Sequence, residues 1–375
     1  MMTKITAAVL HGEGSVAPYA TSRPLELVPL DLAPPRSGEL LVRIDAAGIC
    51  HSDLSVVNGD RPRPLPMVLG HEATGIVEAL GNADDPGFAV GDRIVLAFLP
   101  ACGECARCAA GEGYLCEPAT VANGRGELLR GGTRLCGHEG SVNHHLGVSA
   151  FASHAVVDRR SAVRIDRDIP AKIAALFGCA VLTGVGAVMN SAAVRLGESV
   201  VIYGLGGVGL AALLGAVASG ANPILAIDPS PQKRALAIEL GAHAAVDPDD
   251  ADRMLALHLP GGADVVIETV GKAAVLERAY EAGRRGARIA TVGLPNPAEM
   301  FSVPAVSLVA GGKTLIGSYM GSSIPARDIP RYIALWRAGR LPVERLLTSV
   351  SKIEAINNLL DELAEGRAVR QVVIP

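Results

Sequence analysis

The sequence contains few aromatic residues and few charged ones. Phe, Trp and Tyr make up 3% of its 375 residues, and Asp, Glu, Lys and Arg make up 19%, for a formal net charge of -4. The Lys and Arg residues are scattered along the chain, which indicates neither a track for nucleic acid nor a basic face for lipid. We therefore expect no nucleic-acid partner and no membrane partner.

Long hydrophobic runs are missing as well. No stretch approaches the roughly 18 uninterrupted apolar residues of a membrane span, and Met1 to Thr6 lack the apolar run of a signal peptide. We expect a cytoplasmic protein. Because that compartment keeps thiols reduced, the seven cysteines are predicted to be metal ligands or buried thiols rather than disulfides.

The composition that remains is apolar and rich in glycine. Apolar residues make up 49% of the chain and 43 residues are glycine, which is typical of a packed, turn-rich α/β protein. At roughly 150 residues per domain, the length predicts two domains. Short apolar runs between Gly and Pro turns predict a mainly antiparallel, barrel-like domain over residues 1 to 98.

The second half of the chain has a different pattern. From Ser199 to Val292 buried-strand runs alternate with helical segments, which predicts a doubly wound parallel sheet. The run Val369–Ile374 is predicted to be a strand that rejoins the first domain.

One early stretch carries residues that can bind a metal. It places Cys50 and Asp53 about twenty residues before His71 and Glu72. A thiol and an imidazole are zinc ligands, but two protein ligands do not complete a site, so a third must come from elsewhere in the chain.

Four closely spaced thiols follow, at Cys102, Cys105, Cys108 and Cys116. Four thiolates complete a tetrahedral site around zinc with no open position, which describes a structural site. An iron–sulfur cluster also uses four thiolates, but this spacing fits neither common ferredoxin run. Loop and packing roles are assigned to the residues that show no tight metal spacing, which are Cys136, His138, His144 and His145.

A glycine turn suggests the cofactor. The strand ending at Tyr203 runs into Gly204, Gly206, Gly207, Val208 and Gly209, which open a helix about twenty residues before Asp228. In this context the glycines let the backbone approach a pyrophosphate, and the acid can bind the ribose hydroxyls. A carboxylate there repels a 2'-phosphate, so NAD is favoured over NADP, although Lys233 and Arg234 leave room for tolerance.

Together these residues resemble the zinc-dependent medium-chain alcohol dehydrogenase family. Cys50, the run Gly70–Glu72, the four-cysteine lobe, Cys179 and the run Gly204–Gly209 occur in the order and spacing of that family, over nearly the whole chain. The segment between Cys116 and Cys179 resembles the longer members, which are the liver-type and glutathione-dependent formaldehyde dehydrogenases and their bacterial relatives.

The resemblance implies a domain plan. A GroES-like antiparallel barrel catalytic domain is expected over residues 1–181 and 320–375, with a structural zinc lobe near residues 100–118. A doubly wound Rossmann domain that binds NAD is expected over residues 182–319. The family also implies a homodimer or homotetramer, in which the segment Phe301 to Tyr319 would supply a sheet edge.

The resemblance also implies roles for single residues. Cys50, His71 and Cys179 would bind a catalytic zinc, with Asp53 orienting His71 and Glu72 behind the metal, paired with Arg370. Ser52 would take the alcohol proton, and Phe98 would line the substrate pocket. Contacts to the cofactor would come from His51, Thr183, Val292 and Arg370. The implied reaction is hydride transfer between a primary alcohol, aromatic or of medium chain length, and NAD, with two zinc ions per subunit.

Two departures from the family concern the substrate. Ser55 stands where liver-type members often have the histidine that ends the proton relay, and a serine does not hold a proton near neutral pH. Arg61 and Arg63 stand where the glutathione-dependent enzymes carry acids. These arginines either attract a substrate with a negative tail or belong to a solvated Pro-rich loop, and from the sequence we favour the loop.

Two other functions stay open. A polyol or thiol-adduct dehydrogenase is the alternative among enzymes. A non-catalytic scaffold that binds zinc and a dinucleotide is the alternative outside enzymes, although its expected sign, a lost zinc ligand, is absent because Cys50, His71 and Cys179 are all present.

Overall fold

A computed structural model describes residues 2–375, and its chain divides into two compact units. The first unit comprises Met1–Cys179, Ile324–Pro330 and Leu347–Pro375, and the second comprises Ala180–Ser323 and Arg331–Leu346. Among residues 2–375 no single helix is long and apolar enough to cross a membrane. One pair of helices bent by 50°, Ala171–Gly178 with Ala180–Ser191, meets the length and composition criteria together.

The first unit contains a closed barrel. Its strands follow the order β1-β2-β7-β8-β4, and β1 pairs with both β2 and β4 to close the ring. Alternate residues of β1 and β2, such as Val9, Leu30 and Leu32, are buried inside. The barrel strands are β1 (Thr3–Leu10), β2 (Leu25–Leu32), β4 (Met67–Val68), β7 (Leu135–Gly137) and β8 (Gly140–His144).

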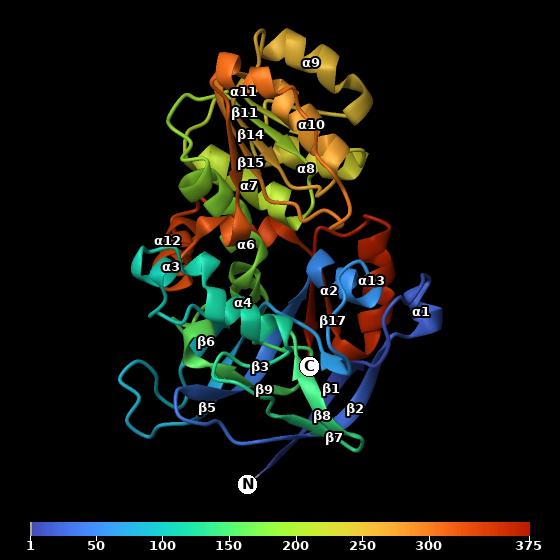
Figure 1. The fold of residues 1–375 in the computed structure, drawn as a ribbon, viewed down its shortest axis with the longest axis vertical. Helices are drawn as coiled ribbons and strands as arrows, with labels where there is room; N and C mark the ends of the chain where they lie inside the picture. The colour runs from blue at the N-terminus through green and yellow to red at the C-terminus, as the bar shows by residue number, and fades with distance from the viewer. Residues whose placement is uncertain (1) are drawn as a thin grey trace. The chain divides into compact units, whose positions relative to one another are not determined.

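A seven-stranded sheet completes this unit, in the order β10-β6-β5-β3-β18-β17, with β9 also paired to β3. The long strand β3 is central, because its first half pairs with β9 and its last residues pair with β18. The strands are β3 (Glu39–Ile49), β5 (Ala73–Leu80), β6 (Arg93–Leu96), β9 (His154–Asp158), β10 (Ala162–Ile165), β17 (Leu347–Lys352) and β18 (Arg370–Ile374). Figure 1 shows β17, in red, beside the blue strands of the chain's first part.

Short helices cover the strands of the first unit. They are α1 (Tyr19–Ser22), α2 (His51–Val57), α3 (Ala106–Ala109), α4 (Glu117–Gly124), α5 (Ala171–Ala174) and α13 (Ile356–Ala364). The helix α13 is strongly amphipathic, and its buried Ile356, Leu360 and Leu363 join the same core as Leu40 and Phe151.

The second unit is built on a six-stranded parallel sheet in the order β13-β12-β11-β14-β15-β16. Its strands are β11 (Val200–Tyr203), β12 (Ile224–Ile227), β13 (Ala244–Val246), β14 (Ala263–Glu268), β15 (Gly283–Thr291) and β16 (Thr314–Gly317). The strands β11, β12 and β14 are almost entirely buried, as expected for a sheet with helices on both faces.

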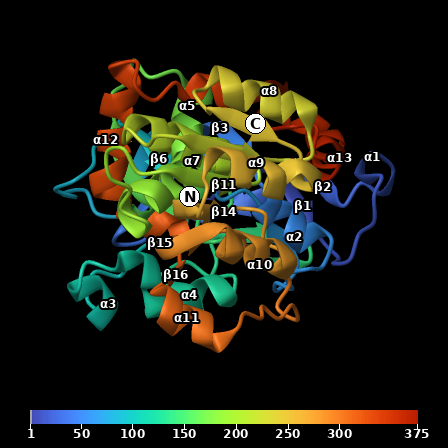
Figure 2. The ribbon, with the colours of Figure 1, turned by 90° about the horizontal axis from the view of Figure 1, so that it is seen from above.

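The chain order reverses direction at β11, so the connecting helices lie on both faces of this sheet. Figure 2 shows α8 and α10 on opposite sides of β11 and β14. The helices are α6 (Ala180–Gly186), α7 (Gly207–Ala218), α8 (Pro231–Glu239), α9 (Ala251–His258), α10 (Ala273–Ala282) and α11 (Ala305–Gly311); α12 (Pro325–Arg337) begins in the first unit and ends in the second.

The predicted fold class is confirmed. The predicted alternation of strands and helices from Ser199 to Val292 is present, and β18 does rejoin the first unit. The expectation of a mainly antiparallel first domain holds with two exceptions, because β17 pairs with β18 and β4 with β8 in parallel. Residues 117–150, for which no element was predicted, contain α4, β7 and β8.

Candidate zinc and cofactor sites

Three residues predicted to bind a catalytic zinc meet inside the first unit. Cys50 follows β3 directly, His71 lies between β4 and β5, and Cys179 follows the 3₁₀ turn Ala175–Gly178. All three side chains are buried, and their ligand atoms lie within 4.8 Å of one another. The arrangement offers two thiols and one imidazole to a single ion and leaves a fourth coordination position open.

The Asp53 carboxylate fixes two of these ligands. One of its oxygens, Oδ2, accepts the backbone N–H of Cys50 at 3.1 Å, as part of the capping box of α2. The other, Oδ1, accepts the N–H of Gly70 at 3.1 Å and lies 3.1 Å from Nδ1 of His71. Because Nδ1 faces a carboxylate, the ring directs Nε2 away from it and toward the two thiols.

Charge in this cluster follows from these contacts. Burial disfavours the ionised form of Asp53, but the His71 and His145 rings beside it outweigh that effect and hold the pKa of Asp53 below its ordinary value. Burial likewise opposes protonation of His71, yet the Asp53 carboxylate outweighs it and raises the pKa of His71 to about 10. The pKa of Cys50 is held well below its usual range, first by the neighbouring Cys179 thiol and then by His71. Burial of Cys50 has the opposite effect but is outweighed.

The residues present fit a zinc ion. His71 Nε2 is buried and has no hydrogen-bond partner among the described residues, a costly state for a polar atom that a metal bond would relieve. Two thiols with one imidazole is a ligand set known for catalytic zinc, and a low thiol pKa supplies the thiolate that zinc requires.

Four further predicted residues lie near these ligands in the chain or in space. Glu72 and Arg370 form an ion pair in which both side chains are almost fully buried, so β18 contributes directly to the site. Ser52 Oγ lies 3.9 Å from Cys50 Sγ. His51 is exposed at the first residue of α2, and its carbonyl accepts a hydrogen bond from Ser55 Oγ at 2.7 Å.

Two rings pack edge-on against the His71 imidazole. The Phe98 ring centroid lies 5.5 Å from that of His71, and the His145 centroid lies 5.6 Å from it. His145 Nδ1 is also 3.3 Å from Asp53 Oδ1, the oxygen that faces His71. The loop and packing role assigned to His145 from the sequence did not indicate that it packs beside the zinc ligands, because no fixed spacing links it to Cys50 or His71.

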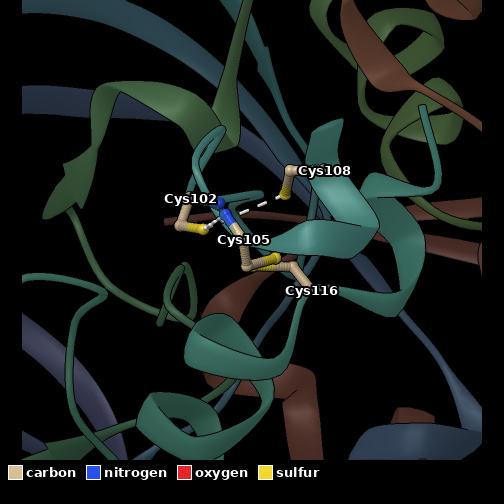
Figure 3. A group of neighbouring side chains, drawn as sticks. All are labelled: Cys102, Cys105, Cys108 and Cys116. Carbon is tan, nitrogen blue, oxygen red and sulfur yellow. Dashed lines mark hydrogen bonds between the residues drawn. The ribbon is translucent and has the colours of Figure 1, made fainter. Parts of the chain in front are cut away.

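The four thiols of the lobe converge on one point, as Figure 3 shows. The Cys102 and Cys108 sulfurs lie 3.9 Å apart, and those of Cys105 and Cys116 lie 4.0 Å apart. A zinc tetrahedron with Zn–S bonds of about 2.3 Å has sulfur–sulfur edges of about 3.8 Å. These distances fit a structural zinc without rearrangement of the lobe.

The charges of the lobe indicate the same ion. Backbone N–H groups point at the sulfurs, since those of Glu104 and Cys105 donate to Cys102 Sγ at 3.4 and 3.3 Å. The N–H of Cys108 lowers the pKa of Cys105 to about 7, whereas burial and the neighbouring thiols raise the pKa of Cys108 to about 12. Four thiolates in this space therefore need a cation.

The glycine turn of the second unit joins β11 to α7. Gly204 has a φ of +88°, which favours glycine, and a Cβ on Gly209 would lie 1.8 Å from the Gly204 carbonyl oxygen. A Cβ on Gly206, in contrast, would meet nothing within 4 Å. The turn thus presents an open backbone surface at Gly206, where α7 begins, and this surface fits a pyrophosphate group.

Asp228 lies at the end of β12 and anchors this turn. Its Oδ2 accepts the N–H of Leu205 at 2.7 Å and its Oδ1 accepts that of Ser230 at 2.8 Å, which leaves acceptor capacity on both oxygens. Arg234, which the sequence suggested for a 2'-phosphate, instead binds the carbonyls of Asp228 and Pro229 and the carboxylate of Asp247.

Three more residues predicted to contact the cofactor lie in the second unit: Thr183, Val292 and Lys233. Thr183 is buried in α6, and its Oγ1 has no hydrogen-bond partner among the described residues. The N–H of Val292, just after β15, donates to the Glu268 carbonyl at 2.8 Å, so only its carbonyl is left for a cofactor. Lys233 is in the first turn of α8 and half-buried.

Comparison with known proteins decides the family. Residues 36–167 match the family model described as "Alcohol dehydrogenase GroES-like domain", and residues 207–337 match "Zinc-binding dehydrogenase". The chain is 37% identical over 356 residues to a geraniol dehydrogenase of Castellaniella defragrans, with 94% of each chain covered. The chain belongs to the zinc-dependent medium-chain alcohol dehydrogenase family.

Solved structures of this family resemble the chain over nearly its full length. The chain is similar to the benzyl alcohol dehydrogenase of Acinetobacter calcoaceticus, with a TM-score of 0.92, 31% identity and 99% of both chains covered. It is also similar to an alcohol dehydrogenase zinc-binding domain protein from Burkholderia ambifaria, with a TM-score of 0.93, 34% identity and 100% of both chains covered. The family membership expected from the motifs is thereby confirmed.

Proposed function

We propose that this chain oxidises a primary alcohol to the aldehyde with NAD as hydride acceptor, and catalyses the reverse reaction. The observation that carries this proposal is the cluster of Cys50, His71 and Cys179, whose buried ligand atoms lie within 4.8 Å of one another. A zinc ion held there would supply a Lewis acid that polarises the substrate oxygen and favours loss of its proton. The family membership supports the same chemistry.

The surrounding residues have roles in that reaction. Asp53 fixes the His71 tautomer and holds the Cys50 backbone, so the ligands keep their positions while substrate enters and leaves. Ser52 beside Cys50 takes the alcohol proton and passes it on. Because Ser55 cannot hold that proton, it leaves through hydroxyl groups and water. Phe98 and His145 exclude water from one side of His71.

NAD binding is assigned to the second unit. The Gly204–Gly209 turn and the amino end of α7 would bind the pyrophosphate. The resemblance to the family also assigns cofactor contacts to His51 and Arg370. Asp228 would bind the ribose hydroxyls, while Thr183 and the Val292 carbonyl would lie against the nicotinamide. The contacts that engage Arg234 support NAD over NADP, since that guanidinium is already held by three oxygens.

The domain plan, assembly and location are part of the proposal. Residues 1–181 and 320–375 form the catalytic domain and residues 182–319 the cofactor domain. A homodimer or homotetramer would form through β16, the edge strand of the second sheet, flanked by exposed Val306 and Val309 of α11. None of the seven cysteines, all of which lie within residues 2–375, forms a disulfide, which supports a cytoplasmic enzyme. Light scattering would measure the assembly.

The test is a spectrophotometric screen of alcohols and aldehydes with NAD(H) and NADP(H), together with a zinc count per chain. We expect NADH to form with a primary alcohol, two zinc ions per chain and preference for NAD. Asp228→Ala should lower kcat/KM with NAD at least about tenfold and leave that with NADP unchanged or higher. If a preparation with two zinc ions and bound NAD turns over no alcohol in a broad panel, the non-catalytic scaffold is the better reading.

A further inference from the structure

The Arg63 side chain is more buried than the solvated loop that we favoured from the sequence implies, although Asp60 and Pro62 of that loop are exposed. The Arg63 side chain is half-buried, and its Nε is fully buried without a hydrogen-bond partner among the described residues. A Cβ on Gly126 would lie 3.0 Å from Pro64 Cγ, so the loop that carries Arg63 packs against the end of α4. Among residues 2–375 no ion pair includes Arg63, although a partly buried guanidinium usually has an anionic partner.

A second unsatisfied donor lies next to Arg63. Arg63 Nη1 approaches the carbonyl oxygen of Asn123 at a long 3.4 Å, which places Asn123 beside the guanidinium. The Asn123 side chain is 4% exposed, and its Nδ2 is buried without a hydrogen-bond partner among the described residues. Two neighbouring residues therefore each carry a buried donor without an acceptor, which matches a ligand that brings acceptors with it.

Asn123 lies near two loops that lead to the candidate catalytic cluster. A Cβ on Gly147 would lie 3.5 Å from Asn123 Oδ1 and 3.4 Å from Pro100 Cδ, so Gly147 adjoins both the Asn123 side chain and Pro100. Pro100 comes two residues after Phe98, and Gly147 comes two residues after His145. Those are the two rings that pack edge-on against His71.

We propose that Arg63 and Asn123 form a subsite for a carboxylate at the far end of the substrate. This inference rests on the proposed function, since the near end of the same molecule is the alcohol oxidised at Cys50, His71 and Cys179. The guanidinium supplies the charge and a planar pair of donors, and the Asn123 amide supplies a further donor. The substrate class is therefore a primary alcohol with a carboxylate tail.

A matched set of substrates tests the proposal. The probes are 4-(hydroxymethyl)benzoate, its neutral methyl ester and benzyl alcohol, with 6-hydroxyhexanoate and 1-hexanol as a flexible pair. We expect Arg63→Gln to lower kcat/KM for the carboxylates about 10- to 100-fold, mainly through KM, because a charge-assisted hydrogen bond is lost. The ester, benzyl alcohol and 1-hexanol should change less than about threefold.

Two further variants separate the subsite from a fold defect. Arg125→Gln removes an equal charge from the exposed C-cap of α4 and should change no substrate. Asn123→Asp places a carboxylate beside Arg63 and should weaken the carboxylates selectively. Equal losses on charged and neutral alcohols, or no loss on either, would overturn the proposal.

The outcome also distinguishes this proposal from the proposed function. If no alcohol in the panel is oxidised, the proposed function fails. The subsite is then judged by calorimetric binding of 4-(hydroxymethyl)benzoate to the zinc-loaded wild-type chain and to Arg63→Gln. Tighter binding to the wild-type chain supports the subsite, and equal binding rejects it.

Discussion

The Asp53 carboxylate faces the His71 imidazole at 3.1 Å, and both side chains are almost completely buried. The same carboxylate accepts the N–H groups of Cys50 and Gly70. One side chain therefore sets the position of a thiol ligand through its backbone and the orientation of an imidazole ligand through its ring.

Replacing this carboxylate should weaken zinc binding. In Asp53→Asn the amide keeps one acceptor oxygen, but its NH2 group must face an N–H donor, and the charge that raises the basicity of His71 is lost. We expect zinc affinity of the catalytic site to fall about 10- to 100-fold, measured by competition with a chelator. Asp60→Asn, in an exposed loop two residues after Asn58, is the control; equal affinities in the two variants would refute this role for Asp53.

The four-cysteine lobe should hold its own ion. Cys108→Ser removes one of four converging sulfurs, so the chain should lose one zinc of two and at least about 2 kcal/mol of stability against unfolding. Zinc analysis and urea unfolding check this. Cys136→Ser changes an exposed thiol on β7 and should leave both quantities unchanged. Retention of two zinc ions in Cys108→Ser would contradict a structural zinc in the lobe.

Two glycines of the cofactor turn should respond differently to the same change. Gly209→Ala forces a methyl group into the Gly204 carbonyl and should cost about 1–3 kcal/mol of stability or more. Gly206→Ala meets open space, so the protein should fold normally while the KM for NAD rises about 10- to 100-fold. Thermal melts and steady-state kinetics separate the two effects. A normal KM for NAD in Gly206→Ala would contradict the assignment of pyrophosphate binding to this surface.

His144 should make the first unit sensitive to acid. Burial and then the charge of Arg134 lower the pKa of His144 to about 3, below its ordinary value near 6.5. The unfolded chain therefore binds a proton that the folded chain rejects. Titration of His144 therefore does not reduce the free energy of unfolding above about pH 6.5. Below that pH it lowers the free energy of unfolding by about 1.4 kcal/mol for each pH unit, down to about pH 3.

The comparison of wild type with His144→Gln tests this dependence. The glutamine oxygen can accept the Arg134 N–H that His144 Nε2 now accepts at 3.0 Å, but it does not titrate. Between about pH 7 and pH 5.5, the wild-type free energy of unfolding should fall about 1 kcal/mol more than that of the variant. Parallel pH curves for the two proteins would count against a neutral buried His144.

The sequence was most informative where a motif is local. The turn at Gly204 and the thiols from Cys102 to Cys116 lie within short segments, so their spacing reports their geometry. The contacts of His145 and Asn123 could not be predicted in this way. Each depends on how residues 117–150 fold back onto the barrel, and that segment has short elements with no clear hydrophobic period.

The burial of the charged Arg63 side chain also could not be predicted from the local sequence. A Pro-rich stretch with two arginines is typical of a hydrated loop, and nothing in its composition indicates that Gly126, just after α4, lies against Pro64. The burial of a loop side chain depends on tertiary packing, whereas propensity and period describe only the local chain.

The pairing of β18 with β3 has a consequence for how the protein is made. Strand β3 and the residues that follow it leave the ribosome early, but Arg370, the partner of buried Glu72, is synthesised only after the whole second unit. Until then the Glu72 carboxylate has no positively charged partner, and the edge of β3 that pairs with β18 is unpaired. A nascent chain should therefore be unable to retain zinc at Cys50 and His71 until Arg370 has been synthesised and β18 has paired with β3.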